Sequence, residues 1–391
     1  MALPDFTVDR NSTKYVLGSG GDIISYATDE PAIEFNTDGS FKGLLVEPAA
    51  TNICKQSEDF TTTWASVNAT ITANATTAPD GNSTADKLND DSGTGTNTVF
   101  VKQVITVSAA TKYTASVFLK ADQLSFARVQ AAAYDGATFG FQYFDLSGAG
   151  SLGTASNLQD SSITAYPNGW YRCSITWTQG AGDTSFQFEI FVADSISNIT
   201  VDRDGTSSIF VWGAQVEASP IATSYIPTTT ASVTRVKDDI TQTGASSLIG
   251  QSEGTLYVEV DWRFASGTNQ RLLSINNNTS NNRIVLLNSG SNLLMFATSD
   301  SATVLNQGSS SLAYSGIQKI AFAYKTDDFE LYRNGSSIAS DTDGSLAELA
   351  TLTHIDLGQS DGASAQANMH IRAVALYKTR LTDDQLADLT S

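Results

Sequence analysis

The sequence has 391 residues, enough for two or three domains of roughly 150 residues that each bury a hydrophobic core. Asp and Glu (41) outnumber Lys and Arg (22), so the formal net charge is −19, which argues against nucleic acid or an anionic membrane as a partner. Charged residues make up only 16% of the chain and aromatic residues 9%, a composition typical of ordered β-proteins rather than of disordered chains.

The chain shows no signal for membrane insertion or export. No stretch approaches the roughly 20 apolar residues of a membrane span. Residues 1–10 lack the basic and then apolar pattern of a secretory signal, so we expect synthesis in the cytoplasm without a signal peptide. Cys54 and Cys173 are far apart in the sequence and have no metal-binding spacing, so they are expected to be incidental thiols.

The first half of the chain divides into an opening segment and a long β series. Residues 1–55 are predicted to be an irregular attachment segment, with a turn at Asp38-Gly39 between two short apolar pieces. Residues 56–228 hold strands in which apolar and polar residues alternate, for example from Tyr113 and from Phe186. One apolar and one polar face per strand is typical of antiparallel sheets packed as a sandwich.

The second half begins with a linker and continues as another β series. Residues 229–249 are rich in Thr, Ser and Gly and are predicted to be the linker, and 250–391 hold the strands, with a type I′ hairpin signal at Asn334-Gly335. Capping-box patterns occur at 345–348 and at 382–385, and the second predicts a C-terminal helix. The sequence therefore predicts an all-β protein of two antiparallel β-sandwich (jelly-roll) domains in tandem, with an irregular N-terminal segment and a short C-terminal helix.

Few groups are suited to acid–base chemistry. The two histidines, His354 and His370, are expected to be structural, and no serine-nucleophile or zinc motif occurs. Glu259 and Asp261 alternate on one strand, so both carboxylates face the same side, roughly 6–7 Å apart, and two carboxylates are the minimum for glycoside hydrolysis. The next residue on that face is Arg263, which cannot act as an acid. We therefore expect a solvated outer face and no catalysis.

Calcium is the one metal that the sequence leaves open. Asp202 and Asp204, and then Asp341 and Asp343, place alternate carboxylates in turns. Ca²⁺ takes six or more oxygen ligands and each pair supplies only part of such a shell, so ordinary turns are expected. No cofactor is predicted, although the sequence does not exclude one structural Ca²⁺.

Aromatic residues are the main candidates for ligand contact, because sugar rings have apolar C–H faces that stack on aromatic rings. Strand alternation assigns three of the five tryptophans to core faces: Trp177, Trp212 and Trp262. Trp64, Tyr134 and Trp170 lie at a strand start, before a turn and in a turn. These three are the predicted carbohydrate-binding residues, and core packing is the alternative for each.

An ordered set of motifs extends over residues 1–237. It comprises FTVDRNST (6–13), GLLVEPAATN (43–52), SEDF (57–60) with Trp64, APDG (78–81), ADKL (85–88), WGAQVE (212–217), TSYIPT (223–228) and VTR (233–235). This set resembles the carbohydrate-binding-like jelly-roll module of fibre, spike and other structural proteins of tailed bacteriophages.

A second set of motifs lies in residues 250–391. It comprises FELYRNG (329–335), IDLG (355–358), IRAVALY (371–377) and LTDDQL (381–386). This set resembles a concanavalin A-like, laminin-G-type sandwich, a fold that serves lectins, adhesion domains and glycan-cleaving enzymes.

The two resemblances imply a virion component that contacts other virion proteins and host surface polysaccharide, and that assembles as a homo-oligomer, with a trimer favoured. They also imply that the shared motifs are structural and do not mark a sugar site. We therefore expect a non-enzymatic tail fibre, spike or head fibre protein that mediates adhesion. The alternatives are a polysaccharide depolymerase acting through the C-terminal sandwich, with Glu259 and Asp261 as acid and base, and a purely architectural decoration or adaptor protein.

Overall fold

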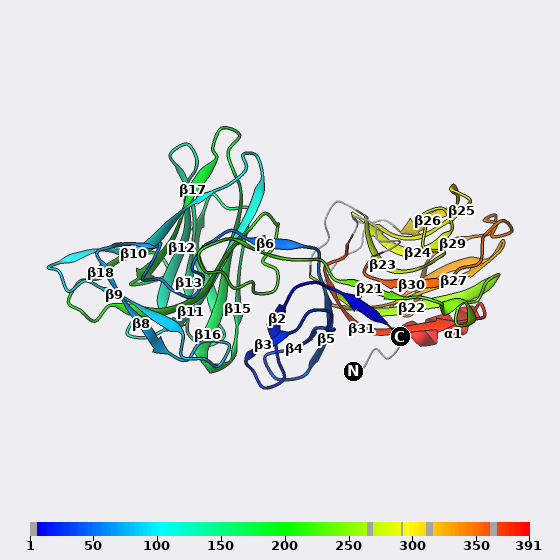
Figure 1. Cartoon of the computed structure of the whole chain (residues 1–391), viewed down its shortest axis with the longest axis horizontal. Helices are drawn as coiled ribbons and strands as arrows, with labels where there is room; N and C mark the ends of the chain where they lie inside the picture. Colours follow the sequence, from blue (N-terminus) through cyan, green and yellow to red (C-terminus); the bar gives the residue numbers. More distant parts are fainter. Residues whose placement is uncertain (1–5, 264–268, 291, 310–315, 360–365) are drawn as a thin grey trace.

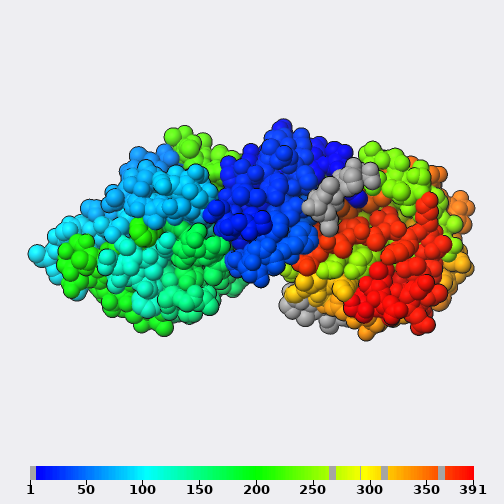
Figure 2. Space-filling model, turned by 90° about the horizontal axis from the view of Figure 1, so that it is seen from below, coloured from blue at the N-terminus to red at the C-terminus, as the bar shows by residue number. Residues whose placement is uncertain are grey.

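The computed structural model describes residues 6–263, 269–290, 292–309, 316–359 and 366–391. Figure 1 shows two β-rich bodies along the long axis of the molecule, with N-terminal strands between them. In Figure 2 the N-terminal segment, in blue, covers the junction between the two bodies. The predicted all-β class, with antiparallel sandwiches in tandem and a short C-terminal helix, is confirmed.

The first body is a jelly-roll sandwich of two antiparallel sheets, which we call distal and proximal. The distal sheet has the strand order β14 (Ser151–Ser156), β13 (Thr138–Asp145), β12 (Phe126–Asp135), β17 (Ser185–Ala193), β10 (Thr96–Thr106) and β18 (Thr200–Asp202), and β7 (Ala65–Val67) also pairs with β10. The proximal sheet has the order β15 (Asp160–Ala165), β16 (Trp170–Thr178), β11 (Lys112–Ala121), β19 (Ser208–Glu217), β9 (Ala85–Asp90) and β8 (Ala69–Thr76). A 3₁₀ turn at Pro167–Gly169 joins β15 to β16.

The two faces of the proximal sheet contact different partners. Its inner face packs on the distal sheet, where Trp177 meets Phe186. Its outer face carries Trp170 and Trp212, which pack with Tyr225 under the N-terminal segment. The outer face of the distal sheet therefore lies on the opposite side of the sandwich, away from this junction.

The second body is a sandwich whose two sheets also take in strands from the N-terminal segment. One sheet has the order β1 (Thr7–Asp9), β21 (Asp239–Gln242), β30 (His354–Leu357), β23 (Asn269–Asn276), β24 (Arg283–Ser289), β25 (Asn292–Ser299) and β26 (Ala302–Ser309). The other has the order β29 (Ser336–Asp341), β28 (Phe329–Arg333), β27 (Ile317–Lys325), β22 (Glu253–Trp262), β31 (Met369–Tyr377), β5 (Phe41–Val46) and β4 (Ile33–Phe35). The buried Trp262 belongs to the core between these sheets, as predicted.

The N-terminal segment is thus shared between the two bodies. In β5, Leu44 pairs with Ile371, and in β1, Val8 pairs with Ile240. Leu44 and Val8 enter the C-terminal core, whereas the hairpin of β2 (Lys14–Leu17) and β3 (Ile23–Tyr26) lies against the jelly roll through Ile23. A further pair, β6 (Ala50–Asn52) with β20 (Val233–Arg235), ties the segment to the chain that leaves the jelly roll. The attachment role and the domain boundaries predicted from the sequence stay predictions.

Six charged residues form what we call the junction ion cluster, where the N-terminal segment meets both bodies. Its members are Arg10, Lys14, Glu47, Arg235, Asp238 and Arg263. Lys14 Nζ lies 2.6 Å from Asp238 Oδ2 and 3.2 Å from Glu47 Oε2, and all three side chains are buried. Burial opposes the charged form of Glu47, but Arg235, Lys14 and Arg263 outweigh it and hold the pKa of Glu47 well below its usual value.

Local signals are confirmed where turn and cap chemistry decides the structure. Asn334 (φ 47°) and Gly335 (φ 81°) form the predicted hairpin turn between β28 and β29, because a type I′ turn needs two positive φ angles. The capping box of Thr382 and Gln385 starts helix α1 (Asp383–Thr390), and Leu386 buries its inner face. The similar pattern at 345–348 gives a turn and no helix. No helix in the described ranges is long and apolar enough to cross a membrane.

Candidate functional site

The outer face of the distal sheet carries a band of aromatic rings, which we call the aromatic band. Successive residues of a strand point to opposite faces, so Val129 and Phe188 enter the core while their neighbours point outward. The outward residues of the band are Phe100 on β10, Phe139, Phe141 and Tyr143 on β13, and Phe191 on β17. Strand pairing places Arg128 of β12 between Tyr143 and Phe191.

Arg128 lies in the middle of the band. Its guanidinium carbon is 4.2 Å from the ring centroid of Phe141, 5.0 Å from Phe191, 5.5 Å from Tyr143 and 6.0 Å from Phe139. These distances are those of cation–π contacts, which hold the side chain in place. Nη1 donates to the Tyr143 hydroxyl at 3.4 Å, whereas the buried Nε–H meets no acceptor in the described part of the chain. The rings therefore fix the guanidinium on the outer face, with its Nε–H enclosed among them.

The rings of the band pack in pairs and reach solvent at one end. Phe100 and Phe191 stack with centroids 4.3 Å apart, and Phe139 and Phe141 lie nearly parallel at 6.0 Å. Phe139 is 45% exposed, and Val104 on the same face is 67% exposed. An apolar surface of this kind on a sheet face is open to a flat ligand.

A row of polar side chains runs across the strands beside the rings: Lys102, Gln130, Gln187 and Glu189. Gln130 Nε2 donates to Glu189 Oε2 at 2.5 Å and Lys102 Nζ donates to Gln187 Oε1 at 2.8 Å. Within the described chain, the buried Oε1 of Gln130 accepts no hydrogen bond. Burial raises the pKa of Glu189, against the opposing effect of Gln130 and Lys102.

The band and the row together have the chemistry of a saccharide-binding face. Phe139 is exposed and Phe100 and Phe141 are half-buried, so these rings can stack on the C–H face of a sugar, whereas Tyr143 and Phe191 are buried beside Arg128. The row contains one carboxylate, Glu189, whereas glycoside hydrolysis uses two.

The three predicted carbohydrate-binding residues lie apart from one another. Trp64 is 6% exposed in the jelly-roll core, where its Nε1 donates to Gln56 O at 3.2 Å. Trp170 is 1% exposed under the N-terminal segment, on the other side of the proximal sheet. Because both indoles are enclosed by protein, neither offers a stacking face in this conformation. Tyr134 is half-buried at the end of β12 and donates to Asn157 O at 2.9 Å, and its ligand role stays a prediction.

The predicted acid–base candidates are held in ion pairs. Glu259 forms a salt bridge with Arg372 at 2.8 Å, and Arg263 turns to Glu47 of the junction ion cluster. His370 is buried with Nε2 2.6 Å from Glu34 Oε2, and burial lowers the pKa of His370 against the opposing effect of Glu34. The ring is therefore neutral at pH 7 and donates to the Glu34 carboxylate. A catalytic role for Glu259 stays the alternative hypothesis.

In the two Asp-containing turns considered as calcium sites, the carboxylates accept hydrogen bonds from their own turns. Asp204 Oδ1 accepts from Thr206 N at 3.0 Å, and Asp341 Oδ1 accepts from Asp343 N and Gly344 N at 3.1 and 2.9 Å, as in Asx turns. Among the residues that the structure describes, no group of three or more His, Cys, Asp and Glu side chains could hold a metal ion. A structural Ca²⁺, which the sequence left open without predicting it, stays untested.

Part of the aromatic band could have been predicted from the sequence. Phe139, Phe141 and Tyr143 alternate with Gly140 and Gln142, a period-2 aromatic pattern that marks one face of a strand. The position of Arg128 among these rings depends on the order of strands in the sheet, which a single sequence does not give.

One family profile matches the C-terminal body. Residues 235–387 match the sequence profile of the Laminin_G_3 family, described as the concanavalin A-like lectin/glucanases superfamily. No curated protein matches the chain.

Several solved structures are similar to part of the chain. The CBM40 domain of the Ruminococcus gnavus IT-sialidase bound to α2,3-sialyllactose is 17% identical, with a TM-score of 0.33, over 38% of this chain and 86% of that one. Domain 4 of AbnA, a GH43 extracellular arabinanase from Geobacillus stearothermophilus in complex with arabinotriose, is 15% identical, with a TM-score of 0.34, over 44% and 84%. The sialidase of Trypanosoma rangeli is 9% identical, with a TM-score of 0.32, over 78% and 60%.

None of these matches bears on a bacteriophage origin, which stays a prediction. Residues 235–387 form a concanavalin A-like lectin/glucanase domain.

Proposed function

We propose that this protein binds glycans without cleaving them, and that the outer face of the jelly roll is a binding surface. The observation that carries the proposal is the position of Arg128, enclosed by four aromatic rings on an outward face, with a buried N–H that no described residue uses. A cation fixed in this way loses little side-chain entropy when it binds a sugar hydroxyl.

The C-terminal domain supports a role in glycan recognition, because the matched superfamily is one of lectins and glucanases. Within it, the carboxylate of Glu259 is neutralised by Arg372. This pairing favours a lectin function over a glucanase function for the domain.

We further propose that the protein is part of a tailed-phage virion, as a tail fibre, spike or head fibre, and contacts host surface polysaccharide. The support is the ordered motif set of residues 1–237. Stacking on a shallow face is weak for a single site, and assembly as a homotrimer on the particle would raise the avidity through effective concentration.

A glycan array probed with the full chain tests the binding proposal, with Phe141→Ala and Arg128→Gln as the variants. Both should lose at least about tenfold in affinity, because each removes a contact of the band. Ile317→Ala is the matched control, since Ile317 is an apolar residue 47% exposed on the C-terminal sandwich. Absence of binding by the wild type, or equal binding by all variants, would contradict the proposal.

A further inference from the structure

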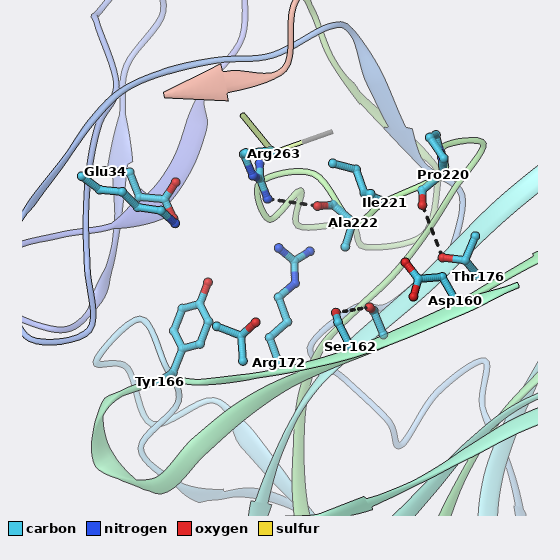
Figure 3. A pocket seen from close by; sticks show the side chains of 13 residues that line it. Glu34, Asp160, Ser162, Tyr166, Arg172, Thr176, Pro220, Ile221, Ala222 and Arg263 are labelled. Carbon is cyan, nitrogen blue, oxygen red and sulfur yellow. Dashed lines mark hydrogen bonds and ion pairs between the residues drawn. The ribbon is translucent and has the colours of Figure 1, made fainter. Parts of the chain in front are cut away.

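A polar cleft lies where the jelly roll, the N-terminal segment and the C-terminal sandwich meet, on the side of the jelly roll opposite the aromatic band (Figure 3). Its volume is about 370 Å³, within the range of roughly 300–1,000 Å³ that is typical of ligand pockets. One wall is the outer face of β15 and β16, and the others come from residues 220–222, Glu34 and Arg263.

The sheet wall is lined by hydroxyl groups. Strand alternation points Ser162 of β15 and Ser174 and Thr176 of β16 to the same side. Ser162 Oγ lies 2.7 Å from Ser174 Oγ, and Thr176 Oγ1 accepts from or donates to Thr114 Oγ1 at 2.8 Å. A hydroxyl can both donate and accept, so this wall can match the hydroxyls of a polyol.

Arg172 supplies a cation inside the cleft. Figure 3 shows its guanidinium in the middle of the space, between Tyr166 and Ser162. Nη1 donates to Thr223 O at 2.7 Å and Nη2 to Ser116 Oγ at 3.1 Å, which fixes the group, while the buried Nε–H meets no acceptor in the described residues. Arg172 is only 8% exposed.

The charges near Arg172 are already matched with other groups. Arg263 pairs with Glu47, and Glu34 pairs with His370 and, at 3.5 Å, with Lys42. Within the described ranges no carboxylate forms a salt bridge with Arg172, although the buried Glu217 interacts with it electrostatically, and the exposed Asp160 also lines the cleft. A buried cation without a carboxylate in direct contact favours pairing with an anion from outside.

We propose that this cleft binds the carboxylate of an acidic saccharide unit. The planar carboxylate pairs with the fixed guanidinium of Arg172, and the sugar hydroxyls exchange hydrogen bonds with Ser162 and Ser174. Ile221 lines the cleft and gives the C–H face of the ring an apolar contact. The site is independent of the aromatic band. Its walls come from four separate parts of the chain, so a bound ligand also stabilises the junction between the two bodies.

Calorimetric or NMR titration of the full chain with methyl β-D-glucuronide, methyl β-D-glucoside and inorganic phosphate tests the proposal. The glucuronide should bind at least about tenfold more tightly than the glucoside and the phosphate, because it alone has both the carboxylate and the ring hydroxyls. Arg172→Gln should abolish this preference, and Arg172→Lys should restore part of it. Asp160→Asn should strengthen glucuronide binding about two- to threefold, because it removes a repelling charge.

Asp160 is exposed, so its variant keeps the proposal testable if Arg172→Gln does not fold. The control is Arg203→Gln, which removes a half-buried arginine paired with Asp91 outside the cleft, and which should leave the titration unchanged. Phe141→Ala, which tests the aromatic band, should also leave it unchanged, so the two proposals can fail separately. Equal affinity for glucuronide and glucoside, equal affinity for phosphate, no binding of any probe, or no effect of Asp160→Asn would each overturn the proposal.

Discussion

Lys14 and Asp238 are 224 residues apart in the sequence, yet Lys14 Nζ donates to Asp238 Oδ2 at 2.6 Å inside the junction ion cluster. Asp238 also accepts from Arg10 Nη1 at 3.0 Å and from Glu47 N at 2.8 Å. One aspartate after the jelly roll therefore fixes three residues of the N-terminal segment. The motifs of residues 1–237 include three members of this cluster: Arg10, Glu47 and Arg235. In these motifs the charged residues therefore form buried ion pairs rather than ligand contacts.

Asp238→Asn should destabilise the protein by about 3–5 kcal/mol, because it leaves Lys14 and Arg10 buried with too little negative charge. Urea unfolding followed by tryptophan fluorescence measures the effect. Arg203→Gln, which breaks an exposed ion pair with Asp91, is the control and should change the midpoint little. A small effect of Asp238→Asn would mean that water enters the cluster and screens its cations.

Leu44→Ala should weaken the C-terminal sandwich by about 2–5 kcal/mol although Leu44 lies in the N-terminal segment, because its side chain is 4% exposed in the C-terminal core. Hydrogen exchange resolves where protection is lost: we expect it in β31, the partner of β5, and not in β10. Leu88→Ala, in the jelly-roll core, should give the opposite distribution. Uniform loss in both bodies would instead show that they unfold as one unit.

Acid should destabilise the protein in two ranges through the Glu34–His370 pair. Burial lowers the pKa of His370 from its usual value of 6.5. As the pH drops below 6.5, the histidine is protonated in the unfolded chain before it is protonated in the folded protein, so the free energy of unfolding decreases. Burial alone would raise the pKa of Glu34, but His370 and Lys42 lower it from 4.5 to about 2. The ionised Glu34 therefore stabilises the folded protein fully above about pH 4.5, and this stabilisation is lost as the pH falls toward 2.

Denaturation midpoints from about pH 7.5 down to about pH 5 measure the first range, and His370→Asn should flatten the change. His354→Asn is the matched control. A profile that is the same for both variants would exclude His370 as the source.

Both thiols should be unreactive in the folded protein. Burial raises the pKa of Cys54 and of Cys173, and each side chain is 0% exposed, so little thiolate is formed and no reagent reaches it. A chromogenic disulfide reagent should label neither cysteine in buffer and both in guanidinium. Rapid labelling of Cys54 in buffer would show that the chain around it opens locally.

Host polysaccharide incubated with the protein should release no reducing ends, and Glu259→Gln should not change glycan binding, since Glu259 is paired with Arg372 on the outer face of β22. A reducing-end assay with an added glycosidase as positive control measures this. Release that disappears in Glu259→Gln would establish the depolymerase alternative instead.

Local chemistry was readable from the sequence, and long-range pairing was not. Period-2 alternation identified the strands around Tyr113 and Phe186, and the Asn334-Gly335 turn and the Thr382 cap are each decided within four residues of chain. In contrast, the pairing of Leu44 with Ile371 depends on contacts more than three hundred residues apart, for which short apolar pieces carry no signal.

The candidate sites show the same division. Alternation pointed to polar faces, but Trp64 and Trp170 could not be assigned, because both lie where strands start and alternation has not yet fixed a face. The cleft at Arg172 is formed by residues from four separate parts of the chain, so only the folded arrangement reveals it.

The pairing of β5 with β31 in the C-terminal sheet has a consequence for biosynthesis. Its partner β31 leaves the ribosome only after roughly 320 further residues, which at about 5–20 residues per second takes about 16–65 s. During that interval a nascent chain carries the apolar run Leu44, Leu45 and Val46 without its final neighbour. Synonymous codon changes that slow translation between the two strands should therefore lower the yield of native protein, by lengthening the time in which this run is open to aggregation or to a chaperone.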